Sequence, residues 1–409
     1  MKLRFALLAA LSSLTSSGAD PARDFAGLRA QVVALGELMA PPAVHGAEAF
    51  APAGSIKPLF FDGLPYQGKA TRVFAWLGLP SERTGKVPGI VLVHGGGGTA
   101  FKEWVQQWNA HGFAALSIAV EGQTDERIPG APPGAQWKRH PAGGPARQGI
   151  YGDAAEPLAD QWMYHALADT ILAHSLLRSL PEVDATRVGV SGISWGGVIT
   201  STVLGLDARF AFGIPIYGCG HLFDAANQYG RALGESALYR EVWDPVRYLP
   251  RAQLPVLWLS WPEDAHFPLD CQAASYRAAP GPRLVALLPG MKHSHPAGWN
   301  PPDGYAFAAS VVREGKPWCT QTRLTLQPDR AEIEFTSTKP LARATLISTT
   351  GSGFTGSRRW TESPARIRPQ GDTWIVTTEL PAGTTAWFVN ARSGALTVSS
   401  DYQETNAAR

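Results

Sequence analysis

A single serine lies at the centre of the stretch Gly192-Ile193-Ser194-Trp195-Gly196, which joins an apolar, β-branched run to a segment of helical character. A side chain at the apex of such a sharp strand-to-helix turn needs small neighbours, because Cβ atoms two residues away on either side would collide. The two glycines remove those atoms and leave Ser194 facing outward. The spacing therefore predicts a nucleophile elbow with Ser194 as the nucleophile.

A serine needs two partners for this chemistry. Its hydroxyl becomes nucleophilic when a base removes the proton, and a carboxylate must hold that base in the correct tautomer. On an α/β sheet these partners are expected later in the chain, first the acid and then a histidine, each directly after a strand. Asp264 follows the apolar run 254–261, and His293 follows the run 283–290. We expect Asp264 to orient His293 and His293 to serve Ser194.

The sequence leaves other side chains open for these two roles. His293 is preferred as the base because it comes soonest after its strand, and Asp264 is preferred as the acid by its place in the order. The alternatives are Glu263 and Glu121 for the acid, and His295 and His266 for the base.

Acyl transfer also needs preorganised N–H donors for the oxygen that becomes negatively charged. One such donor is the amide of Trp195, directly after the nucleophile. A second is expected from the run of four glycines behind His94, since glycine lets a backbone approach the substrate closely. We take Gly96 and Gly97 as the candidates, and the sequence leaves the register within residues 95–98 open.

Several tryptophans fall in loops or helices near the ends of expected strands. Aromatic faces stack on sugar rings and aryl groups, although many tryptophans serve only to fill a core. The candidates for contact with substrate are Trp162, Trp261 and Trp299.

Residues 1–19 have the pattern of a secretory signal peptide. Lys2 and Arg4 precede an apolar run, and small residues with Ser17 and Ala19 follow around a plausible cleavage point. We therefore expect a periplasmic or secreted protein. No later run reaches the roughly 18 apolar residues of a membrane-spanning helix, so no membrane association is expected.

The charge balance excludes some partners. The chain has 36 Lys and Arg against 34 Asp and Glu, and cleavage after Ala19 would remove two positive charges and leave 34 against 34. A neutral chain without basic runs argues against nucleic acid and anionic membranes as partners. The three cysteines, Cys219, Cys271 and Cys319, are too few and too scattered for a disulfide framework or a zinc site, and no metal is expected.

Residues 56–318 alternate strand-like and helix-like segments, which predicts an α/β domain with a mostly parallel sheet. Two Gly-, Pro- and polar-rich segments, 122–157 and 221–250, interrupt this alternation, and we expect the first to lie near the mouth of the site. The expected strands are 71–79, 89–95, 113–120, 187–192, 210–218, 254–261 and 283–290, and the expected helices are 101–111, 158–179, 195–205, 270–278 and 303–314.

The pattern changes after residue 319. Short β-branched or alternating runs follow one another with turn signals between them and no helical spacing, which predicts a small antiparallel β-sandwich. The expected strands are 331–338, 343–350, 372–380, 384–391 and 395–400.

Four stretches together resemble a known superfamily. They are the elbow at Ser194, the HGGGG run at 94–98, WPEDAHFP at 261–268 and MKHSHPAGW at 291–299. They resemble the α/β-hydrolase superfamily and, within it, the secreted acetylxylan esterases and dienelactone-hydrolase-like hydrolases. The tail AWFVNARSGALTVSS at 386–400 is similar to the PhoPQ-activated pathogenicity-related proteins.

This resemblance implies an α/β-hydrolase fold, a triad of Ser194, Asp264 and His293, and no metal or organic cofactor. Dienelactone hydrolases proper use a cysteine nucleophile, so Ser194 argues against that substrate. The expected organisation is a signal peptide (1–19), an α/β-hydrolase catalytic domain (20–318) and a β-sandwich domain (319–409).

We expect a secreted serine carboxylesterase that hydrolyses acetyl or other short-acyl esters of carbohydrates or small alcohols through an acyl-enzyme. One alternative is a prolyl-oligopeptidase-type peptidase or amidase, but the roughly 50 residues before the first expected strand are too few for its usual N-terminal propeller. Another is a non-catalytic carbohydrate-binding or cell-surface protein with a hydrolase-like core, against which the complete Ser, Asp and His set argues. The sequence predicts no oligomeric state.

Overall fold

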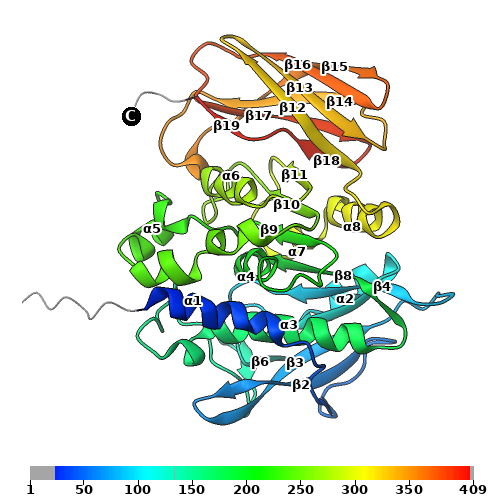
Figure 1. Ribbon diagram of the computed structural model, residues 1–409, viewed down its shortest axis with the longest axis vertical. Coiled ribbons are helices and arrows are strands. Elements are labelled where there is room, and N and C mark those ends of the chain that lie inside the picture. The colour runs from blue at the N-terminus through cyan, green and yellow to red at the C-terminus, as the bar shows by residue number, and fades with distance from the viewer. Residues whose placement is uncertain (1–23, 133, 406–409) are drawn as a thin grey trace, which may run out of the picture.

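The computed structural model describes residues 24–132 and 134–405, so the expected signal peptide at 1–19 lies outside the described residues. Two sheets dominate the fold (Figure 1). The larger lies in the N-terminal part of the chain, and the smaller is formed by strands that begin at Cys319.

The larger sheet has nine strands in the order β1-β2-β3-β5-β4-β8-β9-β10-β11. The strands from β5 onward run parallel to one another, while β1, β2 and β3 join antiparallel at one edge. The bounds are β1 Val44–Gly46, β2 Lys57–Tyr66, β3 Lys69–Gly78, β4 Val87–Val93, β5 Ala114–Ile118, β8 Val183–Ile193, β9 Gly213–Ile216, β10 Val256–Ser260 and β11 Arg283–Leu287.

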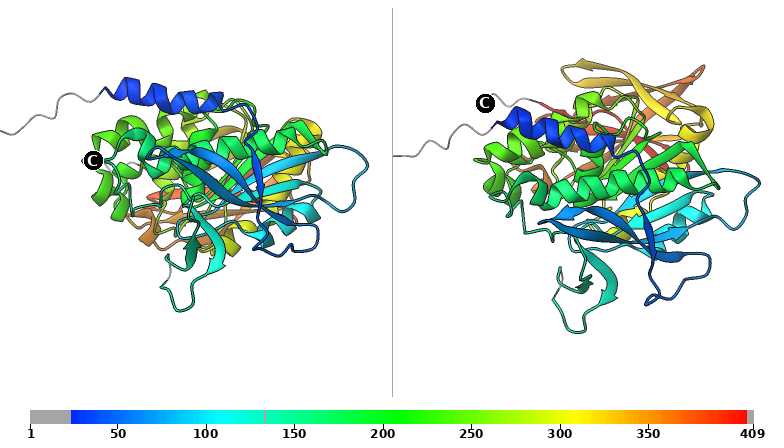
Figure 2. Two further views of the ribbon diagram at one scale, coloured as in Figure 1. Left: turned by 90° about the horizontal axis from the view of Figure 1, so that it is seen from below. Right: turned by 60° about the horizontal axis from the view of Figure 1, so that its bottom comes forward.

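The central strands are largely buried because helices cover both faces of the sheet. Every residue of β5, β9 and β10 is buried. Figure 2 shows α1 and α3 side by side on one face, and on the other face α2 and α8 meet where Trp108 and Tyr305 approach to 4.6 Å between ring centroids. The bounds are α1 Phe25–Ala34, α2 Lys102–Ala110, α3 Trp162–Ser179, α4 Trp195–Val203, α5 Gln228–Leu233, α6 Leu269–Ala278, α7 His295–Trp299 and α8 Pro302–Glu314.

The two segments expected to interrupt the alternation carry their own short elements. Residues 122–157 hold a two-stranded hairpin, β6 Gln123–Arg127 and β7 Trp137–Arg139, which projects from the body of the molecule (Figure 2). Residues 221–250 hold α5 and several short helical turns.

Short helical segments also occur elsewhere in the described chain. Including those in 221–250, they are Leu35–Glu37, Leu158–Asp160, Leu222–Asp224, Tyr239–Trp243, Pro245–Arg247, Leu249–Arg251 and Thr355–Ser357.

The smaller sheet is antiparallel and folds over itself. Its order is β12-β13-β16-β15-β14-β17-β18, with β19 paired to β17. Strand β15 pairs with β14 through residues 361–365 and with β16 through residues 366–370, so it passes from one layer to the other. The bounds are β12 Cys319–Gln327, β13 Arg330–Ser337, β14 Arg343–Thr349, β15 Thr361–Gln370, β16 Thr373–Glu379, β17 Ala386–Ser393, β18 Leu396–Ser399 and β19 Gln403–Glu404.

The two sheets meet at β11, the edge strand of the larger one. The backbone N–H of Leu287 donates to Ser399 Oγ at 2.8 Å, and its carbonyl accepts from Asn390 Nδ2 at 2.9 Å. Ser399 Oγ and Asn390 Oδ1 are themselves 2.6 Å apart. Side chains of β17 and β18 therefore satisfy backbone groups that would otherwise remain open at this edge.

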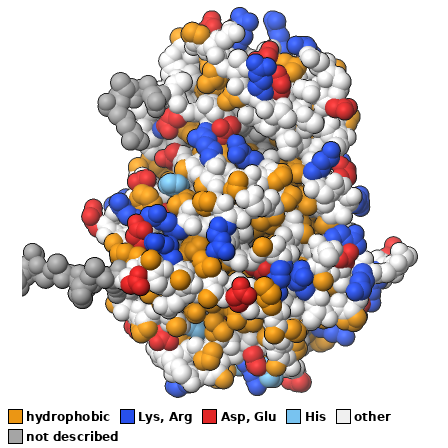
Figure 3. Space-filling view, in the orientation of Figure 1, with side chains coloured by type: hydrophobic (Ala, Val, Ile, Leu, Met, Phe, Trp, Pro, Cys, Tyr) orange, Lys and Arg blue, Asp and Glu red, His pale blue; other side chains and the backbone are white. Residues whose placement is uncertain are grey.

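The fold class expected from the sequence is confirmed, including the antiparallel C-terminal unit. All three cysteines are buried free thiols. Among the described residues, no helix is both long and apolar enough to cross a membrane. Basic and acidic side chains are interspersed on the face seen in Figure 3, in keeping with the near-neutral chain.

Candidate active site

Ser194 occupies a strained turn between β8 and α4. Its φ of 59° and ψ of −116° lie where a residue with a Cβ rarely stays. A Cβ on Gly192 would lie 2.0 Å from the carbonyl oxygen of Gly196, and one on Gly196 would lie 2.1 Å from the carbonyl oxygen of Val93. These contacts explain why both flanking positions are glycine.

Three of the expected site residues form one hydrogen-bonded row. His293 Nε2 lies 3.0 Å from Ser194 Oγ, and His293 Nδ1 lies 2.9 Å from Asp264 Oδ2. Asp264 follows β10 and His293 follows β11. Because these strands run parallel to β8, the loops after them lie at the same edge of the sheet as the elbow. In this arrangement Nδ1 carries the proton toward the carboxylate and Nε2 faces the hydroxyl.

Asp264 is fully buried and each of its oxygens has two donors. Oδ1 accepts from the backbone N–H groups of His266 and Phe267, at 2.8 and 3.0 Å. Oδ2 accepts from His293 and from Trp261 Nε1, the latter at 3.2 Å. Four donors hold the carboxylate in one orientation.

The imidazole of His293 is also held by stacked rings. The ring of Tyr217 lies 4.4 Å away at an interplanar angle of 27°, and that of Phe267 lies 5.9 Å away at 14°. The hydroxyl of Tyr217 donates to the carbonyl of Lys292 at 2.8 Å, which ties the loop before His293 to β9. Rotation of the imidazole away from Ser194 would have to break these contacts.

The alternative bases occupy other positions. His266 Nδ1 contacts Gln228 Nε2 at 2.8 Å, and the ring lies 4.7 Å from His293 without a recorded contact to Ser194. His295 Nε2 accepts from the backbone N–H of Gly95 at 2.9 Å. Burial lowers the pKa of His295 to about 3, so its imidazole stays neutral and can accept that bond.

The alternative acids do not hydrogen-bond to His293 in the described part of the chain. Glu121 contacts Arg147 Nε at 3.0 Å and accepts from the Gly97 amide at 3.3 Å. The Oε2 atom of Glu263 is buried without a hydrogen-bond partner in the described part of the chain. Neither carboxylate has a recorded contact with the imidazole of His293.

The glycine run 95–98 lies directly beside the elbow. A Cβ on Gly95 would lie 3.0 Å from Ser194 Cβ, and one on Gly96 would lie 2.7 Å from Trp195 Cδ1. Gly95 and Gly97 donate their N–H groups to His295 and Glu121, whereas the amides of Gly96 and Trp195 have no acceptor among the described residues. Of the expected oxyanion donors, Gly96 and Trp195 are free and Gly97 is engaged.

The three tryptophans expected to contact substrate lie in different surroundings. Trp162 is 2% exposed, and its Nε1 donates to the carbonyl of Val120 at 2.6 Å, so its ring lies in the core beneath Trp195. Trp261 is half-buried and donates to Asp264. Trp299 stacks on Trp104 with ring centroids 5.7 Å apart. None of the three hydrogen-bonds to Ser194 in the described part of the chain.

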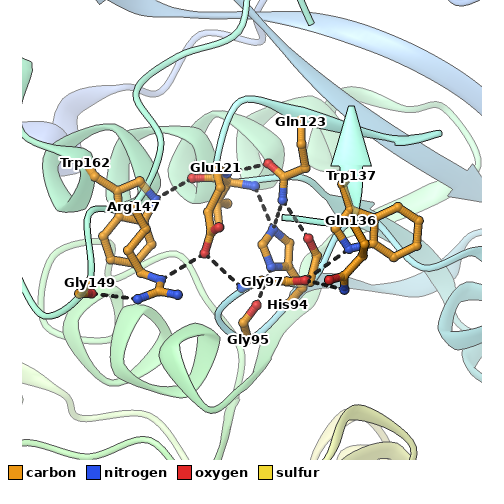
Figure 4. Close-up of polar contacts among 12 residues, drawn as sticks. His94, Gly95, Gly97, Glu121, Gln123, Gln136, Trp137, Arg147, Gly149 and Trp162 are labelled. Atoms are coloured by element: carbon orange, nitrogen blue, oxygen red, sulfur yellow. Dashed lines mark hydrogen bonds and ion pairs between the residues drawn. The ribbon is translucent and has the colours of Figure 1, made fainter. Parts of the chain in front are cut away.

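Sequence reasoning passed over Arg147, which lies at this site. Its guanidinium is 5.3 Å from the ring centre of Trp195 and also contacts Glu121 (Figure 4). Arg147 belongs to the Gly- and Pro-rich segment 122–157, where no periodicity singles out one residue. The expectation that this segment lies near the mouth of the site was the signal that could have directed attention to it.

Comparison with known proteins agrees with this architecture. Residues 53–248 match the family model of acetyl xylan esterase (AXE1), a span that includes the glycine run, Arg147 and Ser194 and ends before Asp264. An acetyl xylan esterase from Paenibacillus sp. R4 is similar in structure at 24% sequence identity, with a TM-score of 0.51 over 66% of this chain and 90% of that one. Acetyl xylan esterase 1 from Thermoanaerobacterium sp. JW/SL YS485 is similar at 20% identity, with a TM-score of 0.52 over 66% and 89%.

At sequence identities of 24% and 20%, the similarity to these two structures supports the fold alone. The match to the family model covers the strands from β2 to β9 and the helices from α2 to α5. The chain thus has the α/β-hydrolase fold, and its residues 53–248 match the acetyl xylan esterase family.

Proposed function

We propose that this protein is a serine carboxylesterase that removes acetyl or other short acyl groups from carbohydrates or small alcohols. The observation that carries the proposal is the row of hydrogen bonds from Ser194 Oγ to His293 at 3.0 Å and from His293 to Asp264 at 2.9 Å. The match of residues 53–248 to the acetyl xylan esterase family supports an ester of a carbohydrate as substrate.

In the first half-reaction, Ser194 Oγ forms a bond to the ester carbonyl carbon while His293 Nε2 takes the hydroxyl proton. The imidazolium that results is stabilised by the Asp264 carboxylate at Nδ1. Collapse of the tetrahedral intermediate breaks the bond to the alcohol oxygen, and His293 returns its proton to that oxygen. The alcohol leaves, and the acyl group remains on Ser194.

The negative charge of the intermediate is placed on the former carbonyl oxygen. The amides of Gly96 and Trp195 are the two free N–H groups beside the elbow, and we assign them to this oxygen. Loss of one such donor typically lowers the rate by 10²- to 10³-fold, which is why a fixed loop at 95–98 matters for the reaction.

In the second half-reaction a water molecule takes the place of the alcohol. His293 removes its proton, the hydroxide attacks the acyl carbon, and Ser194 Oγ leaves with the proton that His293 returns. The products are the carboxylic acid and the free enzyme.

The proposal includes export from the cytoplasm. The basic and apolar start of the chain is the basis for it, with cleavage near Ala19. Expression with the full leader, followed by N-terminal sequencing of the mature protein, tests this part. Recovery of the uncut chain in the cytoplasmic fraction would overturn it.

The function is tested with the purified protein and its Ser194→Ala variant on 4-nitrophenyl acetate, acetylated xylan and a peptide 4-nitroanilide. We expect ester hydrolysis by the native protein and a loss of about 10⁴-fold or more in the variant. Ser201→Ala is the matched control, because Ser201 lies in α4 and has only a 3.4 Å contact with the carbonyl of Gly218.

The possible results separate the alternatives. Equal rates for native protein and Ser194→Ala would exclude serine catalysis. Faster cleavage of the anilide than of the esters would identify a peptidase or amidase instead. Turnover of 4-nitrophenyl acetate without release of acetate from xylan would restrict the substrate to small esters.

A further inference from the structure

Arg147 is a cation placed beside the nucleophile, and two of its three guanidinium nitrogens are accounted for. Nε lies 3.0 Å from Glu121 Oε1, and Nη1 donates to the carbonyl of Gly149 at 2.6 Å (Figure 4). The central carbon Cζ of the guanidinium lies 5.3 Å from the ring centre of Trp195 and 6.0 Å from that of Trp162. These contacts fix the direction in which the third nitrogen points.

The third nitrogen, Nη2, has no hydrogen-bond partner within the described chain. It lies next to the free oxyanion donor, since a Cβ on Gly96 would come within 2.8 Å of it. The side chain of Arg147 is 19% exposed. Its Nη2 atom is not buried, so it remains accessible to a ligand. A preoriented and accessible guanidinium N–H thus adjoins Gly96 and Trp195.

Glu121, the carboxylate beside Arg147, lies near two guanidinium groups. Two guanidinium groups act on Glu121: Arg147 through its ion pair, and Arg139, whose Nη1 donates to the backbone carbonyl of Glu121. Burial raises the pKa of Glu121, while both arginines act in the opposite direction. Glu121 is the only carboxylate that pairs with Arg147 in the described part of the chain, and it takes Nε, so Nη2 can pair with the anion of a substrate.

We propose that Arg147 Nη2 forms a carboxylate-binding subsite, so that the preferred substrates are esters carrying a carboxylate near the scissile bond. A guanidinium pairs with carboxylate oxygens through strong, directed hydrogen bonds, and a partly buried setting strengthens them. The carboxylate could belong to the acid that is released or to the alcohol, as in an acylated uronic acid. This inference rests on the proposed esterase function and adds the substrate class.

The experiment compares two pairs of esters that differ in charge at one position. For the acyl side, the pair is mono(4-nitrophenyl) succinate and 4-nitrophenyl pentanoate. For the alcohol side, it is 4-acetoxybenzoate and 4-acetoxybenzamide. We expect kcat/KM of the native protein to be about 10- to 100-fold higher for the charged member of one pair, the range that a charge-assisted hydrogen bond supplies.

Arg147→Gln should abolish this preference, while kcat/KM for the neutral esters should fall less than about threefold. Arg147→Lys should retain part of it, because the charge remains but the directed nitrogen is lost. The matched control is Arg127→Gln, since Arg127 is an exposed arginine of the same segment whose guanidinium lies 4.6 Å from the ring centre of Trp137. It should leave both kinds of ester unaffected.

A binding measurement makes the test independent of turnover and of folding defects. Benzoate and succinate are titrated into Ser194→Ala, and into the double variant that also carries Arg147→Gln, by calorimetry, with thermal unfolding of each variant recorded alongside. At least one anion should bind the first protein and lose about 10-fold or more in affinity for the second. Equal affinities would overturn the subsite.

Failure of the subsite and failure of the esterase proposal have different signatures. If the native protein hydrolyses the neutral esters with no preference for either charged one, the subsite is wrong and the esterase stands. If Arg147→Gln lowers kcat/KM for charged and for neutral esters by the same factor, Arg147 only supports the loop and the subsite is again wrong. If Ser194→Ala hydrolyses every ester at the native rate, the esterase proposal fails, and anion binding alone decides the subsite.

Discussion

His295 Nε2 accepts the backbone N–H of Gly95 at 2.9 Å, only two residues after the histidine that faces Ser194. The carbonyl of the same glycine accepts from His94 Nδ1 at 2.7 Å. Two imidazoles therefore hold one residue of the glycine run. His295 must be neutral to accept from Gly95, and His94 must be neutral because its Nε2 accepts the backbone N–H of Val120 at 3.0 Å. His295 is a positioning residue, because it holds the loop that presents the Gly96 amide.

Replacing His295 by leucine should lower kcat about 10-fold with little change in KM, since the oxyanion loop would lose an anchor but substrate contacts would remain. His295→Gln, which retains an acceptor oxygen, should recover part of the loss. Steady-state kinetics on 4-nitrophenyl acetate measures both. A leucine variant with native kcat would show that the loop keeps its position without His295.

Asp264→Asn should lower kcat by about 10⁴-fold while the fold is retained. The amide oxygen can still accept from the backbone N–H groups of His266 and Phe267, but the NH₂ group cannot accept from His293 Nδ1. The imidazole would then present a protonated Nε2 to Ser194 and could not act as a base. A circular dichroism spectrum and kcat of the variant provide the measurement, and a kcat within 10-fold of native would contradict the assigned role.

The stability of the protein should fall between about pH 6.5 and pH 4. Burial lowers the pKa of His94 and of His174 to about 4, whereas an unfolded histidine titrates near 6.5. Across this range the unfolded chain binds more protons than the folded one, so acidification favours unfolding. Each histidine contributes about 3 kcal/mol of this loss at most, from the difference between its two pKa values.

Urea unfolding at pH 7.0 and 4.5 measures this dependence. The matched variant is His174→Gln, because His174 is buried against Asp207 and lies apart from the row at Ser194. It should be less stable than native at pH 7.0 but should lose less on acidification. A native protein equally stable at both values would refute the expected pH dependence.

Gly196→Ala should destabilise the fold by about 3 kcal/mol or prevent folding. The added Cβ would meet the backbone carbonyl oxygens of Val93 at 2.1 Å and His94 at 2.6 Å, and backbone atoms cannot rotate away. The control is Gly304→Ala in α8, where the added atom has no neighbour within 4 Å and alanine favours a helix by about 1 kcal/mol. Thermal unfolding that ranks the two variants in the opposite order would contradict this account of the elbow.

The sequence predicted those parts of the molecule that depend on local patterns. The seven expected strands of the larger sheet are all present, and Ser194, Asp264 and His293 come together because their order along the chain reflects the order of parallel strands. Strand β15 was not predicted, since its residues are mostly exposed and include two prolines, so it lacks an apolar alternation. Strand β12 was passed over because most of its side chains are polar, and of its two leucines Leu326 is exposed.

The parts of the site that depend on long-range contacts could not be predicted in the same way. Arg147 and Glu121 are 26 residues apart, and the register of the glycine run depends on acceptors supplied by Glu121 and by His295, 200 residues away. No spacing rule links such positions. Burial also depends on such contacts. The sequence allowed the ring of Trp162 to stack on a sugar, but in the structure this ring is buried in the core.

The hydrogen bonds of Ser399 and Asn390 to the backbone of Leu287 have a consequence for self-association. An open edge strand is a template on which a second molecule can add a strand and start a chain of copies. The contacts at Leu287 close this end of β11 to such pairing, and the opposite edge strand, β1, has only three residues. The C-terminal strands thus protect this end of the larger sheet from strand addition by a second copy.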